Sequence, residues 1–195
     1  FFLIHFSSED EKLLPEQKAL KEITHTAKLI FMPGNEKASE AELDSLYEAS
    51  EGKGLLVNFG AEWCGACQRE KENLRKIFTA NKKIPFIRVL VPEEDKNFSL
   101  SEFNKDLYPI FLDKEKKLIE KFKIRALPQT LLFNEEGELI YRHKGALDSS
   151  ENLLSLQKNI DSFLSRQKIR SEKEKNTNLK NDPIGSKLFS FSLED

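Results

Sequence analysis

The chain is poor in cysteine and histidine, and it has no excess of either charge. Its 195 residues include 2 Cys and 3 His, and 31 Lys+Arg stand against 33 Asp+Glu, for a formal net charge of -2. Because a basic excess is missing, we expect neither nucleic acid nor an anionic membrane surface as a partner. Two cysteines cannot supply a framework of structural disulfides, so the fold must rest on its hydrophobic core.

Signals for a metal or an organic cofactor are also missing. The histidines, His5, His25 and His143, lie far apart in the sequence without ligand spacing, so the cysteines have no partners for a zinc site. The chain has no Gly-x-Gly-x-x-Gly turn of the kind that binds dinucleotides. We therefore expect neither a metal ion nor an organic cofactor.

No long hydrophobic run is present. The apolar residues Phe1–Phe6, FFLIHF, are followed at once by polar ones, and a membrane span needs about 20 residues. We interpret them as the trimmed end of a signal or anchor segment, which predicts an exported protein with a membrane tether upstream of Phe1. The alternative is an N-terminal strand or a frayed end that packs on the core.

Strand-like and helix-like patterns alternate along the chain. Strands are predicted at 28–32, 54–59, 85–91, 108–112, 130–133 and 139–141, the last two joined by a turn at 134–137. Helices are predicted after Pro15 (burying Ala19, Leu20 and Ile23), after Ser39, from the cysteine pair onward, after Ser99, after an Asp113 cap (burying Leu118, Ile119 and Phe122) and at 150–164. This order favours an α/β fold with parallel crossover connections.

The length suggests one domain with extensions. We divide the chain into an N-terminal extension at 1–26, a domain at 27–165 and a polar, mobile tail at 166–195. Residues 188–193, LFSFSL, alternate like a strand. They are either disordered or a segment that docks on a sheet edge.

Both cysteines lie in the stretch Phe59–Cys67, FGAEWCGAC, directly after a predicted buried strand. A cysteine at the N-terminus of a helix meets free backbone N–H groups and the positive end of the helix dipole, which stabilise a thiolate. We expect the Cys64 sulfur to be exposed with a lowered pKa, and Cys67, one turn inward, to be shielded. Such a pair supports disulfide exchange, with Cys64 as the attacking thiol and Cys67 as the resolving one. A pair of inert structural thiols would need neither Trp63 nor the helix-opening position.

Two segments resemble the thioredoxin superfamily. VNFGAEWCGAC is similar to the active-site strand and turn of that family, and KIRALPQTLLF is similar to its cis-proline segment. The resemblance covers roughly residues 55–164. It implies a thioredoxin-like fold, with a central mixed β-sheet flanked by helices.

The resemblance also implies the residues that bind substrate. It places a cis Leu127–Pro128 bond opposite the cysteines, and cis bonds are almost confined to proline. The implied substrate-binding residues are Trp63, Gly65, Ala66, Leu127 and Pro128. The implied partners are protein disulfides as substrates and another dithiol protein as the electron donor.

Three details resemble the TlpA/ResA group of exported reductases. Asn58 stands where cytosolic thioredoxins usually carry a buried Asp, residues 98–112 look like that group's inserted helix and strand, and the 134–137 turn is similar to its Asp-x-x-Gly turn. Ala66 departs from the proline that many relatives carry, which changes the stiffness of the turn.

The prediction is therefore a thiol-disulfide oxidoreductase that reduces protein disulfides in an exported or periplasmic compartment. The alternatives are a cytoplasmic general thioredoxin and a binding module that keeps the fold without the chemistry. Since Asn58 cannot exchange protons near neutral pH, Glu62 is the candidate for proton transfer to Cys67, against the alternative of a solvated surface carboxylate. Arg125 either steers an acidic partner or points into water.

Overall fold

The computed structural model describes residues 20, 23, 25–31, 50, 52–93 and 107–180. The helices predicted after Ser39 and Ser99, the apolar residues 1–6 and the strand-like residues 188–193 lie outside this range.

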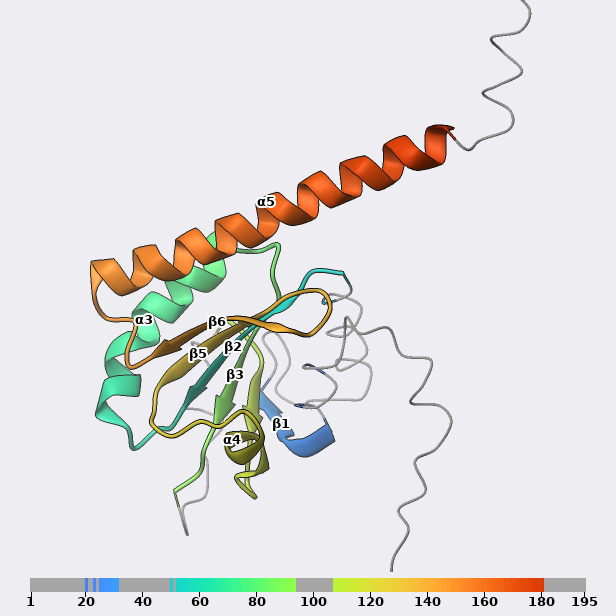
Figure 1. The fold of residues 1–195 in the computed structure, drawn as a ribbon. Helices are drawn as coiled ribbons and strands as arrows, with labels where there is room; N and C mark the ends of the chain where they lie inside the picture. The colour runs from blue at the N-terminus through green and yellow to red at the C-terminus, as the bar shows by residue number, and fades with distance from the viewer. Residues whose placement is uncertain are drawn as a thin grey trace, which may run out of the picture. The chain divides into compact units, whose positions relative to one another are not determined.

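A six-stranded mixed sheet forms the centre of the fold, as predicted (Figure 1). The order across the sheet is β1-β4-β3-β2-β5-β6. β2, β3 and β4 run parallel to one another, whereas β1, β5 and β6 are antiparallel to their neighbours. The strands are β1 Lys28–Phe31, β2 Leu55–Gly60, β3 Phe86–Leu90, β4 Ile110–Leu112, β5 Gln129–Phe133 and β6 Leu139–Lys144.

Three helices have described boundaries: α3 Gly65–Ala80, α4 Lys117–Lys121 and α5 Ser150–Lys180. Leu20 and Ile23 are helical and buried, as predicted. The residues up to Leu156 form one compact unit and those from Gln157 form a second.

Helix α5 continues to Lys180, although the sequence predicts an end near Leu164 and a tail from 166. This stretch is rich in Lys, Arg, Glu and Gln, which are good helix formers, and Arg170 pairs with Glu174 one turn on, at 3.3 Å. The polar composition of residues 166–180 thus suggested a tail, although these residues continue the helix without an apolar face of their own. The mobility of the segment stays a prediction.

The predicted Asp113 cap is displaced. The residue that precedes α4 is Lys116, with φ of 59° and no side-chain cap bond. Asp113 instead accepts the N–H of Ile119 inside the helix, at 3.1 Å, and its side chain is buried. The carboxylate therefore holds α4 against the end of β4.

Strand β2 is buried on both faces, which confirms the prediction of a central strand. Leu55, Val57 and Phe59 belong to a core cluster that also contains Leu118 and Ile124, from α4 and the loop after it. Asn58 faces the other side, where it donates to Glu70 of α3. Since side chains alternate along a strand, the even-numbered residues of β2 lie beneath α3.

Several strands begin or finish at one end of the sheet. β2 leads into the cysteine stretch and the parallel β4 leads into α4. β5 is antiparallel to β2, and Gln129 pairs with Phe59, so Pro128 lies at the same end of the sheet. The candidate site lies there.

The predicted turn between β5 and β6 is confirmed. Asn134 Oδ1 accepts the N–H groups of Glu136 at 3.0 Å and Glu138 at 2.8 Å. Gly137 has φ of 74°, a conformation that glycine adopts without a side-chain penalty.

Candidate active site

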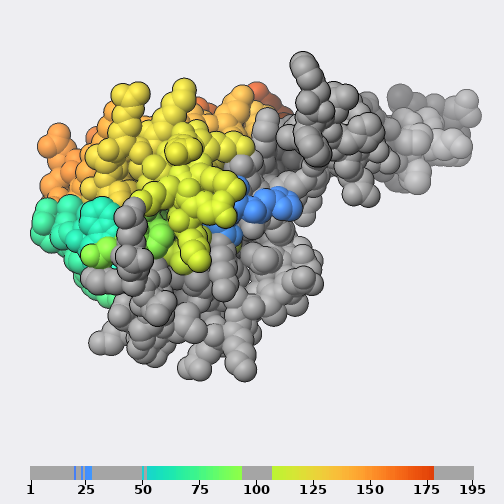
Figure 2. Space-filling model, turned by 90° about the horizontal axis from the view of Figure 1, so that it is seen from below, coloured from blue at the N-terminus to red at the C-terminus, as the bar shows by residue number. Residues whose placement is uncertain are grey.

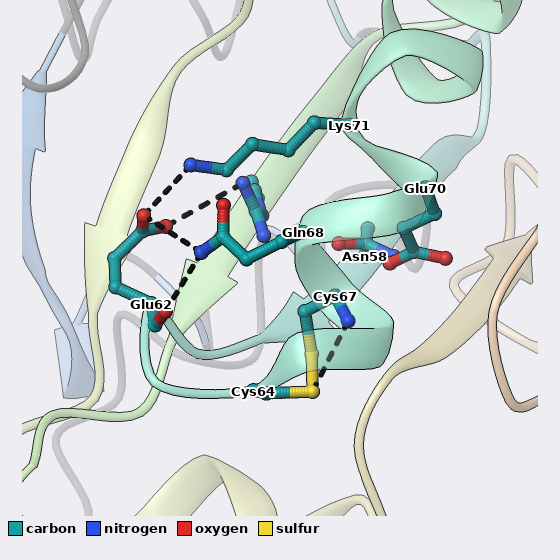
Figure 3. A network of polar contacts seen from close by, with 8 residues as sticks. Asn58, Glu62, Cys64, Cys67, Gln68, Glu70 and Lys71 are labelled. Carbon is teal, nitrogen blue, oxygen red and sulfur yellow. Dashed lines mark hydrogen bonds and ion pairs between the residues drawn. A yellow bond between two sulfur atoms is a disulfide. The ribbon is translucent and has the colours of Figure 1, made fainter.

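The two cysteines form a disulfide at the start of α3, with their Cα atoms 5.2 Å apart. Cys64 is the N-cap residue of the helix, and its Sγ accepts the N–H of Cys67 at 3.2 Å. Figure 3 shows the pair at the first turn of the helix. The sulfur of Cys64 thus takes the place of a capping oxygen, next to backbone N–H groups that favour a thiolate after reduction.

The exposure of the two cysteines differs in part from the prediction. Cys67 is 0% exposed, which confirms that it is shielded, but Cys64 is only 8% exposed. In the disulfide form both sulfurs are therefore largely covered, and Cys64 is the one nearer the surface. The expectation of an exposed Cys64 was wrong because neighbouring apolar residues pack around the pair.

Those neighbours form a small apolar cluster, which consists of Ala61, Cys64, Cys67 and Val91. Ile119 of α4 and Leu127 pack against it. The Leu127–Pro128 peptide bond is cis, as the resemblance implied. Because Leu127 packs against the cluster, the proline segment lies beside the cysteines.

Side chains of β5 and β6 hold the proline segment in place. Gln129 Nε2 donates to the carbonyl oxygen of Ala126 at 3.0 Å, and Arg142 Nη1 donates to Gln129 Oε1 at 2.9 Å. Arg142 Nη2 also donates to the carbonyl oxygen of Phe122 at 2.9 Å. No sequence pattern indicates this clamp, because its members come together only when β5 and β6 pair.

The other predicted substrate-binding residues surround the disulfide at the surface. Trp63 is 54% exposed, Gly65 is exposed and Ala66 is half-buried against the apolar cluster. Figure 2 views this end of the sheet, with teal atoms around α3 and the yellow-green segment that follows β4 on one face. An exposed indole beside a reactive pair offers apolar contact area to another chain.

Glu62 is more enclosed than a surface carboxylate. Its Oε2 accepts from Lys71 Nζ at 2.7 Å and from Gln68 Nε2 at 3.2 Å, as Figure 3 shows. Burial alone would raise the pKa of Glu62, but the hydrogen bonds from Lys71 and Gln68 and the charges of Arg88 and Lys71 hold that pKa below its ordinary value. A carboxylate held in this way is a poor proton acceptor.

Arg88 is the most unusual charged residue of the site. It lies on β3, directly beside Asn58, and its side chain is 0% exposed. Its Nη1 is 3.7 Å from Glu62 Oε1. A side chain on Gly60 would come within 3.1 Å of Arg88 Nη2, so the guanidinium lies close against the backbone of β2. Among the described residues none accepts a hydrogen bond from the guanidinium of Arg88, whose ionic partner is Glu62.

Replacing Arg88 by Met should destabilise the fold by about 3 kcal/mol, because Glu62 and Glu70 would lose a buried positive charge. Urea unfolding at neutral pH measures this loss. The double variant Arg88→Met with Glu62→Gln should recover most of it, since removing both partners of a buried pair is often close to neutral. An equal loss in the single and double variants would show that Arg88 acts by packing alone.

Glu70 is the buried carboxylate nearest to Cys67 along α3. The two residues are three apart on one helix, so they share a face, and both are fully buried. Glu70 Oε1 accepts from Asn58 Nδ2 and Oε2 accepts from the N–H of Leu147, each at 2.9 Å. In Figure 3, Asn58 and Glu70 lie on the opposite side of the helix start from Glu62.

The pKa of Glu70 is raised above its ordinary value. Burial is the main cause and the charge of Asp148 adds to it, against the lowering effects of the bonds from Leu147 and Asn58 and the charge of Arg88. The pKa of Glu62 is thus lowered and that of Glu70 is raised. Perturbed groups of this kind are typical of functional sites.

Sequence reasoning named Glu62 and missed Glu70 and Arg88. A signal for Glu70 was present, since a glutamate three residues after Cys67 must lie on the same helix face. For Arg88 there was none, because a charged residue within a strand is normally assigned to the surface.

In the part of the chain that the structure describes, no cluster of three or more His, Cys, Asp or Glu could bind a metal ion. Within the same residues, no helix combines the length and the apolar character that a membrane span requires.

Known proteins share the fold and the motifs of this chain. A family model described as a thioredoxin-like domain matches residues 46–160, more than half of the chain. Thiol-disulfide oxidoreductase ResA of Halalkalibacterium halodurans is 33% identical over 101 residues, which cover 50% of this chain and 57% of that protein. ResA of Bacillus subtilis is 25% identical over 103 residues, which cover 51% and 58%.

The chain thus spans little more than half the length of these curated relatives. Among solved structures, a putative thiol:disulfide interchange protein DsbE from Chlorobium tepidum matches with a TM-score of 0.51 at 14% identity, covering 71% of this chain and 93% of that one. This likeness shows the fold, and the family model covers both the cysteine pair and the cis-proline. The chain belongs to the thioredoxin-like domain family.

Proposed function

We propose that the protein is a thiol-disulfide oxidoreductase that reduces protein disulfides through Cys64 and Cys67. One observation carries this function: a Cys-x-x-Cys pair at the start of α3, joined as a disulfide, with Leu127 of the proline segment packed beside it. The names of the ResA relatives support the same chemistry.

The reaction proceeds by two exchanges. In the reduced protein the Cys64 thiolate attacks one sulfur of a substrate disulfide, which forms a mixed disulfide and releases the other substrate sulfur as a thiolate. Cys67, as its thiolate, then attacks Cys64 Sγ, which breaks the mixed disulfide and releases the second substrate thiol. Two electrons and two protons pass to the substrate, and Cys64–Cys67 becomes the disulfide. Another dithiol protein must then reduce it.

The proton of the Cys67 thiol needs an acceptor inside the protein, because Cys67 is fully buried. We assign this role to Glu70 rather than to Glu62. Glu70 shares the helix face of Cys67 and has a raised pKa, which brings its proton affinity closer to that of a thiol. Glu62 is held as a carboxylate by Lys71, Gln68 and Arg88.

Substrate binds across the surface around the disulfide. The extended segment that carries the substrate cysteine lies along Leu127 and Pro128, with Trp63 beside it and Gly65 and Ala66 beneath it. The clamp formed by Gln129 and Arg142 keeps the proline segment in position for this contact.

We place the protein in an exported compartment, with protein disulfides as substrates and another dithiol protein as the electron donor. The similarity of Asn58 and its surroundings to exported reductases supports this placement. Labelling the cysteines of intact cells with a membrane-impermeant thiol reagent tests it. Labelling only after lysis would place the protein in the cytoplasm.

Activity is tested with the purified, reduced protein and insulin as a model protein disulfide. The expected result is reduction of insulin that depends on Cys64, so that a Cys64→Ser variant is inactive. Full activity of that variant would show that Cys64 is not the attacking thiol, and no reduction by the wild type would leave a binding module as the function. The equilibrium potential of the pair then gives the direction of electron flow. A value near that of thioredoxin, about -270 mV, supports a reductase, and one near that of DsbA, about -120 mV, means an oxidant.

A further inference from the structure

The segment at 114–125, which contains α4, is basic on its exposed side. It carries two exposed carboxylates, Glu115 and Glu120, and six exposed cations: Lys114, Lys116, Lys117, Lys121, Lys123 and Arg125. Subtracting these residues leaves 25 cations and 31 carboxylates in the rest of the chain. The segment is therefore a local basic surface on a chain that is otherwise acidic.

The inner side of the same segment contacts the cysteine pair. Leu118 and Ile124 are buried in the core, and Ile119 packs with Leu127 against the cluster that contains Cys64 and Cys67. Arg125 precedes the cis-proline by three residues. In Figure 2 the yellow-green atoms of this part of the chain and the teal atoms around α3 appear on the same face.

The segment has six cations against two carboxylates, a net charge of +4. Glu115 pairs with Lys117, and both side chains are about two-thirds exposed, where such a pair contributes little. Lys116 and Lys123 have φ of 59° and 54°. Glycine or asparagine adopts this conformation more easily, so lysine occupies both positions at a backbone cost.

We propose that the exposed side of residues 114–125, the basic surface, is the docking site for an acidic segment that flanks the disulfide of a substrate protein. The inference rests on the proposed function and names its substrate class: proteins with Asp or Glu close to the cysteine that is reduced. Opposite charges on two surfaces accelerate their encounter, and this gain falls with ionic strength. Through Ile119 the segment adjoins Leu127 and the cysteine pair, where a disulfide must approach, so a protein segment fits the surface better than a lipid bilayer does.

The test uses the full reduced chain and two synthetic peptides, each with one internal disulfide. The peptides are identical except that four residues next to the attacked cysteine are Glu in one and Gln in the other. Stopped-flow fluorescence of Trp63 gives the rate constant of the first exchange. At about 0.01 M salt we expect the Glu peptide to react about tenfold faster than the Gln peptide, and at about 0.5 M salt the two rates should converge.

Charge reversal locates the effect. The triple variant Lys114→Glu, Lys123→Glu and Arg125→Glu should bring the ratio of the two rates below one. The corresponding change to Gln at the same positions should bring it close to one. The matched control Lys53→Glu, Lys76→Glu and Lys83→Glu alters the net charge equally, at exposed positions before β2, along α3 and after α3. This control variant should still reduce the Glu peptide faster than the Gln peptide, by most of the wild-type ratio. Unfolding midpoints of all variants check that they fold.

Each contrary outcome has a distinct meaning. Reduction of neither peptide would overturn the proposed function and this inference with it. Equal reduction of both peptides at low salt would overturn this inference alone, as would an equal loss of preference in the control variant. Binding to vesicles of anionic phospholipid that the triple variant abolishes, together with equal peptide rates, would assign the basic surface to a membrane and overturn the substrate class.

Discussion

A Cys67→Ser variant should accumulate covalent complexes with proteins that carry disulfides, and a Cys64→Ser variant should form none. Cys64 is the sulfur nearer the surface and lies at the helix N-cap, so it attacks first, whereas Cys67 is fully buried. Without the Cys67 sulfur the mixed disulfide has no internal route to resolution. We expect multiple turnover of insulin by Cys67→Ser to fall at least 100-fold, because resolution must then await an external thiol.

The complexes are detected as bands on non-reducing gels that disappear with dithiothreitol, and mass spectrometry identifies the linked cysteine. The matched control is the double variant Cys64→Ser with Cys67→Ser, which should trap nothing. Complexes linked through Cys67 in the Cys64→Ser protein would reverse the assigned roles. The absence of any complex with Cys67→Ser would argue against exchange through a mixed disulfide.

The basis of this prediction was visible in the sequence. The strand before Cys64 is an apolar run, the helix after it has a regular apolar stripe, and the strands that follow alternate with helices, so local pattern indicated an α/β fold. The resemblance implied the mixed sheet. The cis bond at Pro128 followed from the resemblance and is confirmed. These features depend on residues close together in the chain.

The polar surroundings of the pair were harder to predict, because they depend on contacts between distant residues. Asn58 and Glu70 are 12 residues apart, and Asn58 also bonds Thr130, which is 72 residues away. Arg88 reaches Glu62 only because β3 lies next to β2. The sequence therefore identified the sulfur chemistry but did not show the ion pairs of Glu62 with Lys71 and Arg88. The role of Glu62 in proton transfer stays a prediction that the experiments below test.

A Glu70→Gln variant should slow the resolution step by about 100-fold at neutral pH, within the range of a lost general base. The measurement is single turnover of the reduced protein with a disulfide peptide, in which release of the second peptide thiol follows attack by Cys67. In the wild type this step should accelerate with pH through the pKa of Glu70, which burial raises above the ordinary value of 4.5. The variant should lack this rise and keep only the dependence on the thiol itself.

Stability provides an independent readout of the same group. A raised pKa means that the folded state binds the proton more tightly than the unfolded state does. The contribution of Glu70 to stability is therefore fully present below about 4.5 and is lost as the pH rises through the raised value. Urea unfolding should show that Glu70→Gln removes this decline. The free energy of unfolding of the variant, relative to that of the wild type, should therefore be higher at pH 8 than at pH 4.

Glu62→Gln is the matched control for the rate experiment, since it removes the other carboxylate near the pair. Its pKa is lowered by Lys71, Gln68 and Arg88, so it is already ionised across the range in which resolution accelerates. We expect the pH profile of Glu62→Gln to keep the rise that Glu70→Gln loses, even if removal of the ion pair lowers stability. If Glu62→Gln abolished the rise and Glu70→Gln retained it, Glu62 would be the proton acceptor. Glu70 would then serve only to bind Asn58 and Leu147.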